Sequence, residues 1–192
     1  LGRSSKLGKI LQSPFTLHTG MLERIERETA HARKGKPARI IAKMNAVVEQ
    51  NIIRALYVAS QAGVKIDLVI RGVCCLRPGV PGVSENIRVR SIIGRFLEHT
   101  RVFYFLNDGK EEIFGSSADW MDRNLHRRVE TCFPIDDKKA RERMIRELNY
   151  YLEDNTQAWE LQRDGNYLRL SPGDREPLSA QQKLLEEMTK GD

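Results

Sequence analysis

One histidine and a group of arginines are the residues of this sequence best suited to chemistry. The segment "RGVCCLRPGVPGVSENIRVRSIIGRFLEH", from Arg71 to His99, contains several arginines and no lysine, although lysine is common elsewhere in the chain. A guanidinium is a rigid planar fork that binds phosphate or carboxylate oxygens through two parallel hydrogen bonds, whereas an ammonium is a mobile point charge. The bias toward arginine therefore indicates a phosphate ligand.

The charged residues of this segment have different expected positions and roles. Arg71 ends the apolar run "IDLVIR", so we expect it at the end of a rigid element, where a cation can neutralise charge on a phosphoryl group. His99 can donate a proton near neutral pH. Arg77, Arg88 and Arg90 are candidates for lining a channel for a polyanionic chain, with a solvated surface charge as an equal alternative for each.

The composition is that of a compact globular protein. Of the 192 residues, 40% are hydrophobic and 30% are charged, which is enough for one buried core. No apolar run approaches the roughly 20 residues that cross a bilayer, and the first residues lack the apolar region of a signal peptide, so we expect a cytoplasmic protein. The net charge of +6 favours a polyanionic partner, although many domains are mildly basic for solubility alone.

The cysteines and the first residue give two further expectations. Cys74 and Cys75 are adjacent and Cys132 lies in an apolar run, so reduced thiols are expected, and the spacing predicts no metal site. The sequence begins at Leu1 and not at a methionine, which indicates a part of a longer chain.

The first half of the sequence predicts a βαβ unit. Its two strands are expected to end at one edge of a sheet, so that Lys43 and Asn45 would reach the same edge as Arg71. Lys43 and Asn45 are therefore further candidates for lining the channel. The elements expected here are a helix at 14–34, strands at 38–45 and 65–72, and a helix at 47–63.

The second half predicts further strands and helices around a loop at 73–86. This loop is rich in proline and glycine and follows the carboxyl end of a strand, where open α/β sheets bind their ligands. Residues 87–99 have apolar residues at helical spacing and are predicted to form a helix that ends at His99. The pattern predicts an α/β fold with a mixed sheet flanked by helices. The remaining elements are expected as strands at 101–106, 111–117 and 127–135, a helix at 136–155, a hairpin of 158–162 and 167–171, and a helix at 179–189.

The residues around His99 resemble a pattern of the phospholipase D superfamily. In that pattern H-x-K, an acidic residue and a G-S-x-N segment surround a phosphoryl group, and the histidine acts as nucleophile or acid. Here His99 is followed by Arg101 in place of the lysine, and "FGSSADWMDRN" comes about 15 residues later. Leu106 occupies the acidic position and Ala118 stands in place of the asparagine.

A longer resemblance covers the chain from about Pro14 to its end. The segments "IDLVIRG", "CLRPGVPG", "SENIRV" and "FLEH", followed by "FGSSADWMDRNLHRRVE", are similar in order and spacing to the C-terminal part of the bacterial polyphosphate kinase family. The resemblance implies a phospholipase D-like fold, the second of two such halves in the whole enzyme. It also implies that 14–192 is the C-terminal catalytic domain and that 1–13 is a flexible linker from an upstream domain.

The resemblance assigns roles to particular residues. The active site of the family lies in the cleft between the two halves, where a histidine of the first half becomes phosphorylated. His99 would act opposite that histidine on the nucleotide phosphates, and Arg71 would contact a phosphate of ATP. Arg101 and Arg128 are the other phosphate-binding candidates. No segment like the family's "KTH" is present, so the phosphorylated histidine would be missing from this chain, and His18, His31 and His126 are interpreted as structural or surface residues.

The resemblance also implies the reaction and its partners. It is the reversible transfer of the terminal phosphate of ATP to a growing polyphosphate chain through a phosphohistidine, and the isolated chain is expected to be inactive. Mg²⁺ is expected as the cofactor, with ligands outside this chain. The expected partners are ATP, ADP, inorganic polyphosphate, the upstream domains and further copies of the full-length protein.

Two other functions fit parts of the sequence. A phosphodiesterase or nuclease of the phospholipase D type would use the same histidine, but it usually needs two intact H-x-K motifs. A basic module that binds polyanions would explain the charge. Binding of nucleic acid is not expected, because single-strand binders interleave stacking rings with basic residues, and Phe96 is the only aromatic residue between Arg71 and His99.

Overall fold

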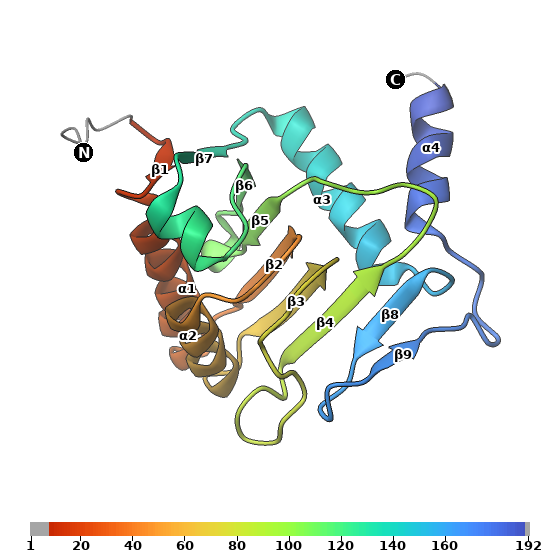
Figure 1. Ribbon diagram of the computed structural model, residues 1–192, viewed down its shortest axis with the longest axis horizontal. Helices are drawn as coiled ribbons and strands as arrows, with labels where there is room; N and C mark the ends of the chain where they lie inside the picture. Colours follow the sequence, from red (N-terminus) through yellow and green to blue (C-terminus); the bar gives the residue numbers. More distant parts are fainter. Residues whose placement is uncertain (1–7, 191–192) are drawn as a thin grey trace.

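The computed structural model describes residues 8–190, which fold around one nine-stranded mixed sheet (Figure 1). The strands lie in the order β1, β7, β6, β5, β2, β3, β4, β8, β9. This architecture confirms the predicted α/β class. The strands are β1 (Leu11–Ser13), β2 (Arg39–Met44), β3 (Lys65–Ile70), β4 (Ile87–Ile92), β5 (Val102–Phe105), β6 (Glu112–Ser116), β7 (Glu130–Pro134), β8 (Ala158–Leu161) and β9 (Tyr167–Arg169). The helices are α1 (Leu17–Arg33), α2 (Gln50–Gln61), α3 (Lys138–Glu153) and α4 (Ala180–Lys190), with a 3₁₀ turn η1 (Asn107–Gly109) and a π-helical turn η2 (Arg123–Arg127).

The centre of the sheet is the predicted βαβ unit. Strands β2 and β3 are parallel, with Met44 opposite Ile70 at their carboxyl ends, and α2 connects them. Strand β4 continues the parallel part, whereas β5 runs antiparallel to β2. The carboxyl ends of β2, β3 and β4 therefore lie at the same edge as the start of β5.

Alternate residues of the central strands face two different helical layers. Ile40 and Ala42 of β2 belong to the large core with α1 and α2, whereas Ile41 packs toward Leu148 of α3. Figure 1 shows α1 and α2 together at one side of the sheet and α3 and α4 at the other. Because both faces are covered, the central strands have continuous apolar runs, which is typical of parallel strands.

Strand β1 differs from the predicted linker at 1–13. Leu11 pairs with Cys132 and Ser13 with Glu130, so β1 forms one edge of the sheet, and α1 begins only at Leu17. The sheet therefore starts before Pro14, and the rest of the predicted linker, residues 1–7, lies outside the described residues. A three-residue strand is too short for an alternating pattern to reveal it.

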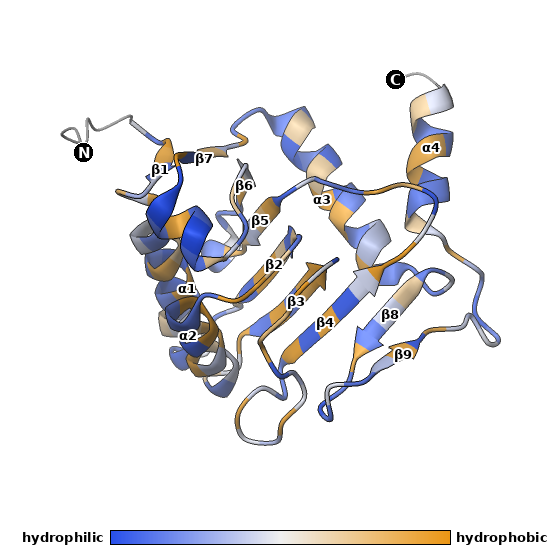
Figure 2. Ribbon diagram, in the orientation of Figure 1, coloured by the Kyte–Doolittle hydropathy of each residue, from blue (hydrophilic) through white to orange (hydrophobic). Residues whose placement is uncertain are grey.

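The helix predicted at 87–99 is wrong. Residues Ile87–Ile92 form strand β4 between β3 and β8, and His99 lies in the loop that follows it. Hydrophobic and hydrophilic residues alternate along β4 (Figure 2), and Ile87 and Val89 are β-branched, which favours a strand. The helical spacing came from Ile92, Ile93, Phe96 and Leu97. The side chains of Ile93, Phe96 and Leu97 are 59%, 45% and 81% exposed in the loop.

The structure bears on two further expectations, those about membrane spans and about the cysteine thiols. No helix within residues 8–190 is both long enough and apolar enough to cross a membrane. Cys74, Cys75 and Cys132 carry free thiols. Burial raises the pKa of the Cys132 thiol to about 12, so this cysteine remains protonated and unreactive.

Arg90 of β4 is a buried structural residue. Its Nη1 atom donates to the backbone carbonyls of Tyr151, Leu152 and Asp154 at the end of α3. The last carbonyls of a helix have no partner within the helix, and a cation there also interacts favourably with the helix dipole. Arg90 therefore fixes α3 on the sheet.

We predict that Arg90→Met lowers the free energy of unfolding by about 2 to 3 kcal/mol, because buried carbonyls lose a charged donor. Arg88→Met is the matched control, since the Arg88 side chain is 56% exposed and shares Asp67 with Arg39. We expect the control to change the free energy by less than about 1 kcal/mol. Chemical denaturation of both variants measures the difference, and equal effects would contradict the structural role of Arg90.

Candidate functional site

Several of the polar residues predicted from the sequence to form the site meet at one edge of the sheet. Asn45 and Arg71 directly follow the carboxyl ends of β2 and β3. Arg101 precedes β5, which pairs antiparallel with β2 so that Val102 lies opposite Lys43. Parallel and antiparallel pairing therefore bring three distant segments of the sequence to this one edge.

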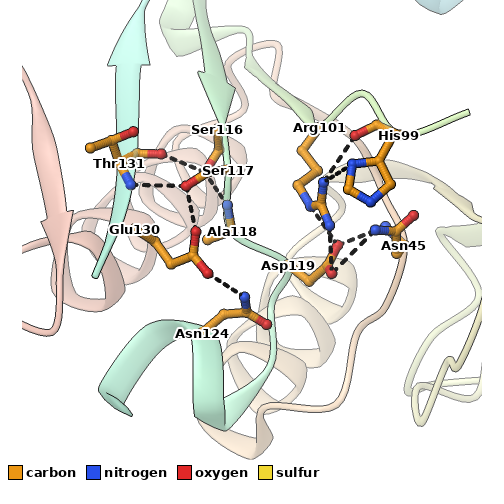
Figure 3. Close-up of polar contacts among 10 residues, drawn as sticks. All are labelled: Asn45, His99, Arg101, Ser116, Ser117, Ala118, Asp119, Asn124, Glu130 and Thr131. Carbon is orange, nitrogen blue, oxygen red and sulfur yellow. Dashed lines mark hydrogen bonds and ion pairs between the residues drawn. The ribbon is translucent and has the colours of Figure 1, made fainter. Parts of the chain in front are cut away.

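The centre of the edge is an ion pair between Arg101 and Asp119. Arg101 Nε lies 3.0 Å from Asp119 Oδ1, and Arg101 Nη2 lies 3.1 Å from Oδ2 (Figure 3). Both side chains are about nine-tenths buried, with exposed fractions of 10% and 8%. Asp119 also accepts a hydrogen bond of 2.8 Å from the backbone N–H of Asn45. The pair thus ties β5, the segment after β6 and the end of β2 together.

The same guanidinium orients His99. Arg101 Nη1 donates to the backbone carbonyl of His99 at 2.9 Å and lies 3.0 Å from His99 Nδ1 (Figure 3). A guanidinium has donors only, so Nδ1 must accept this bond. The neutral ring therefore carries its proton on Nε2, where it can donate to a ligand oxygen.

The loop that carries His99 is held by a second set of contacts. Glu98 forms a 2.8 Å ion pair with Lys43, whose side chain is only 6% exposed. Gln181 of α4 donates to Glu98 and to the carbonyl of Phe96, and accepts from the Phe96 N–H. Lys43, predicted to line a channel, is placed by the structure where it anchors this loop.

Arg71 keeps a donor unused. Its Nη1 atom is buried and has no hydrogen-bond partner among the described residues. The side chain lines a cavity of about 270 Å³ together with Ser91, Trp159 and Tyr167. Gly72 follows it, where a Cβ would lie 3.0 Å from the carbonyl oxygen of Asn45, so the close approach of the two strand ends favours glycine. An orphan donor beside a cavity is suited to an anionic ligand.

Next to this edge a second polar group surrounds Glu130, the first residue of β7. Ser117 Oγ and Asn124 Nδ2 both donate to its carboxylate (Figure 3). The partners of the Glu130 carboxylate are therefore two neutral side chains. Arg128 is exposed two residues before Glu130 and leaves its charge available to solvent or a ligand.

The other predicted channel residues lie elsewhere. Arg77 donates through Nε to the carbonyl of Arg163 in the β8–β9 turn. Arg88 pairs with Asp67 toward the opposite ends of the central strands, and Arg90 is buried beneath α3. The structure therefore brings together Lys43, Asn45, Arg71, His99 and Arg101, but not Arg77, Arg88 or Arg90, and Arg128 lies exposed between η2 and β7.

Magnesium is poorly matched to this edge. Mg²⁺ binds through carboxylates, waters and phosphate oxygens. The two carboxylates nearest His99 are both engaged, Asp119 by Arg101 and Asn45, and Glu98 by Lys43 and Gln181. Within the described residues, this edge has no carboxylate free for the ion.

Asp119 is the site residue that the sequence analysis missed. The resemblance to the H-x-K pattern directed attention to position 106 as the acidic position, and Leu106 is not acidic. Two features of the sequence could have identified Asp119. Arg101 stands in place of the lysine of H-x-K, and Asp119 is the one acidic residue in "GSSADW", which follows the next predicted strand. A buried guanidinium needs acceptors, and a carboxylate is the acceptor that also neutralises its charge.

The nine-stranded mixed sheet with helices on both faces defines a phospholipase D-like fold. The crystal structure of Nuc from Salmonella typhimurium, a phospholipase D family member, matches with a TM-score of 0.58 and 15% identity, covering 80% of this chain and 96% of that chain. At this identity the likeness shows the fold alone.

Closer relatives establish the family. The chain belongs to the family of the polyphosphate kinase C-terminal domain 2, which matches residues 10–181. Polyphosphate kinase from Pseudomonas putida is 61% identical over 190 residues, which are 98% of this chain and 26% of that protein. Polyphosphate kinase from Pseudomonas aeruginosa is 59% identical over 189 residues, which are 98% of this chain and 27% of that protein.

A solved relative extends the comparison to three dimensions. The crystal structure of polyphosphate kinase from Porphyromonas gingivalis matches with a TM-score of 0.94 and 38% identity, covering 98% of this chain and 29% of that chain. The chain therefore spans between a quarter and a third of the length of these relatives.

We predict that neutral His99 is protonated at Nε2 alone. Long-range ¹H–¹⁵N NMR of the imidazole should show Nδ1 as the unprotonated nitrogen, because Arg101 donates to it. The paired variant Arg101→Met with Asp119→Asn removes the donor without leaving a buried unpaired charge, and it should show both tautomers. A wild-type ring protonated at Nδ1 would contradict this geometry.

Proposed function

We propose that this chain forms one wall of the ATP and polyphosphate site of a polyphosphate kinase, which reversibly transfers the terminal phosphate of ATP to a growing polyphosphate chain. The observation that carries the proposal is the edge where Arg71 keeps a buried unpartnered donor and His99 is held by the Arg101–Asp119 pair. Membership of the polyphosphate kinase C-terminal family supports it.

Each residue of the edge has a distinct task in this proposal. Phosphoryl transfer needs little covalent work from a protein and depends on positioning and on neutralising charge on phosphate oxygens. Arg71 binds a phosphate of ATP through its free donor, and Arg128 supplies a second exposed cation. His99 offers its Nε2–H to a phosphate oxygen as a hydrogen-bond donor and electrostatic partner, and it can act as an acid only when the ring is also protonated at Nδ1, which displaces the Arg101 contact. Arg101 acts mainly as a positioning residue, since most of its donors are occupied.

The phosphorylated histidine of the proposed mechanism lies outside this chain. The loop before His99 supports this arrangement, because Ile93, Phe96 and Leu97 expose large apolar side chains next to it. A cluster of exposed apolar residues typically marks a surface that is covered in the complete assembly. In this proposal the other phospholipase D-like half covers the loop and supplies the phosphohistidine, and this chain alone has no kinase turnover.

The cofactor and location follow from the same proposal. Mg²⁺ would enter with the nucleotide, held by phosphate oxygens and by residues outside this chain, because Asp119 and Glu98 are engaged. The complete protein would act in the cytoplasm with ATP, ADP and polyphosphate, and would assemble with further copies of itself.

A phosphodiesterase of the phospholipase D type remains the second candidate, on the strength of the shared fold. Its mechanism uses the lysine of H-x-K as a phosphate-binding cation, and Arg101, the residue at that place, is largely committed to Asp119 and His99. Filter binding of polyphosphate against single-stranded DNA separates the two: preference for DNA would favour the phosphodiesterase.

The variant that tests the proposal is His99→Gln in the complete enzyme. Glutamine keeps much of the size and a donor but has no titratable proton, so we expect the rate of polyphosphate synthesis to fall by about 10²- to 10⁴-fold. The melting temperature should not change, because His99 lies in an exposed loop. Near-normal turnover would contradict the proposal.

His31→Gln is the matched control for that measurement. His31 lies at the end of α1, where its Nε2 is 3.4 Å from Asn107 Oδ1, beyond the opposite ends of the central strands. It should retain the wild-type rate, so a loss common to both variants would indicate a general effect of removing a histidine.

Arg71→Lys should weaken ATP binding although the charge is conserved. Lysine cannot form two parallel hydrogen bonds to one phosphate, and the loss of one charge-assisted bond of roughly 1.5 to 3 kcal/mol raises KM for ATP by about tenfold or more. Arg88→Lys is the control, because Arg88 pairs with Asp67 away from this edge. An unchanged KM for Arg71→Lys would exclude Arg71 from the ATP phosphates.

A further inference from the structure

A cluster outside the proposed phosphate site brings together two histidines and a glutamate. His18 of α1, Glu49 before α2 and His126 of η2 each place one ligand atom so that all three atoms lie within 4.8 Å of one another. The three residues come from segments separated by at least 31 positions in the sequence. Imidazole nitrogen and carboxylate oxygen are the donors of a zinc site with three protein ligands.

The distance between His18 and Glu49 suits a shared metal ion. His18 Nε2 lies 3.2 Å from Glu49 Oε2. Two ligand atoms that are each about 2.1 Å from zinc and subtend a tetrahedral angle lie about 3.4 Å apart. An ion can therefore take the place of the proton that these two atoms share, with little movement of either side chain.

His126 lies close enough to complete the set. Its ring centroid is 4.5 Å from that of His18, and the residue is exposed, so its side chain can turn toward Glu49 without disturbing the core. The exposure of His126 also leaves solvent access for a fourth ligand. The arrangement has three protein ligands and one open position.

Glu49 is built into the fold in the way a metal ligand needs. Its side chain is only 7% exposed, and the carboxylate accepts from the Ile52 N–H at 2.8 Å and from Asn51 Nδ2 at 3.1 Å. Burial alone would raise the pKa of Glu49, but these hydrogen bonds and His18 hold the pKa below its usual value. The carboxylate therefore stays ionised, and its orientation is fixed by outer partners.

We propose that His18, Glu49 and His126 bind one divalent transition-metal ion of the Zn²⁺ class. Two imidazoles select Zn²⁺, Co²⁺, Ni²⁺ or Cu²⁺ over Mg²⁺, which prefers oxygen ligands. The bound ion ties α1, the start of α2 and η2 together and keeps one position for water. The proposal does not depend on the kinase function, and it revises the interpretation of His18 and His126 as purely structural or surface residues.

Titration of the metal-free protein with Co²⁺ and Zn²⁺ tests the site. We expect one Co²⁺ per chain, visible by the absorption of a tetrahedral cobalt centre without a thiolate charge-transfer band, and displacement of Co²⁺ by equimolar Zn²⁺ but not by excess Mg²⁺. Absence of saturable binding, or a thiolate band that disappears in Cys75→Ser, would overturn the proposal.

Variants locate the ion at these three residues. His126→Gln and Glu49→Gln should each weaken binding by at least about tenfold, and Asn51→Ala by about tenfold through the lost outer hydrogen bond. The Glu49→Gln amide oxygen can still accept from Ile52, so this variant keeps the helix cap, and melting temperatures establish that each variant is folded. His31→Gln should bind as wild type. Unchanged affinity in His126→Gln would contradict the assignment.

Discussion

The buried ion pair of Arg101 and Asp119 is the interaction on which the proposed phosphate-binding edge depends. Burial of two charges costs several kcal/mol per ion, and only good geometry with further hydrogen bonds offsets that cost. Here the pair is bidentate and both partners have additional bonds, Asp119 from Asn45 and Arg101 to His99. Removing one partner would leave an unpaired buried charge, at a cost of about 3–5 kcal/mol. The pair therefore specifies one arrangement of His99 and excludes alternatives.

The topology of the sheet explains why the pair can form. Strands β2, β3 and β4 end where β5 begins, so residues from several segments meet at one edge without any long excursion of the chain. Ligands of open α/β sheets bind outside the carboxyl ends of strands for the same reason. The helices contribute at a distance: α4 holds the His99 loop through Gln181, and α3 is fixed to β4 by Arg90. A rigid scaffold thus supports an exposed loop that carries the proposed catalytic group.

The sequence was sufficient to predict the central strands and helix of the sheet, because their hydrophobic patterns are unambiguous. The run "IDLVIRG" and the helical pattern before it predict the βαβ unit and the position of Arg71 at its end, and the structure has both. The helix prediction for residues 87–99 was wrong because apolar spacing does not distinguish a helix from a strand that is followed by an exposed apolar loop. Asp119 could not be found by periodicity, since its importance comes from Arg101, which lies 18 residues earlier and directly precedes β5.

The fate of the arginines shows the limit of reasoning from residue type. Arginine enrichment indicated phosphate for the whole segment, and only Arg71 keeps an unpartnered buried donor at the edge. Arg88 and Arg90 are two residues apart on β4. Arg88 is exposed and pairs with Asp67, whereas Arg90 is buried under α3. The two side chains share one face of the sheet, so their roles depend on how far along the strand α3 covers that face, a tertiary property that the local sequence does not contain.

Coupling between Asp119 and His99 tests the account most directly. In the complete enzyme, the rate of polyphosphate synthesis is measured for Asp119→Asn, His99→Gln and the double variant. If Asp119 acts through Arg101 on His99, Asp119→Asn slows the wild-type enzyme but has little further effect once His99 is replaced, a non-additivity expected of residues in one network. Losses that multiply in the double variant would contradict the account, because the ion pair and His99 would then act independently.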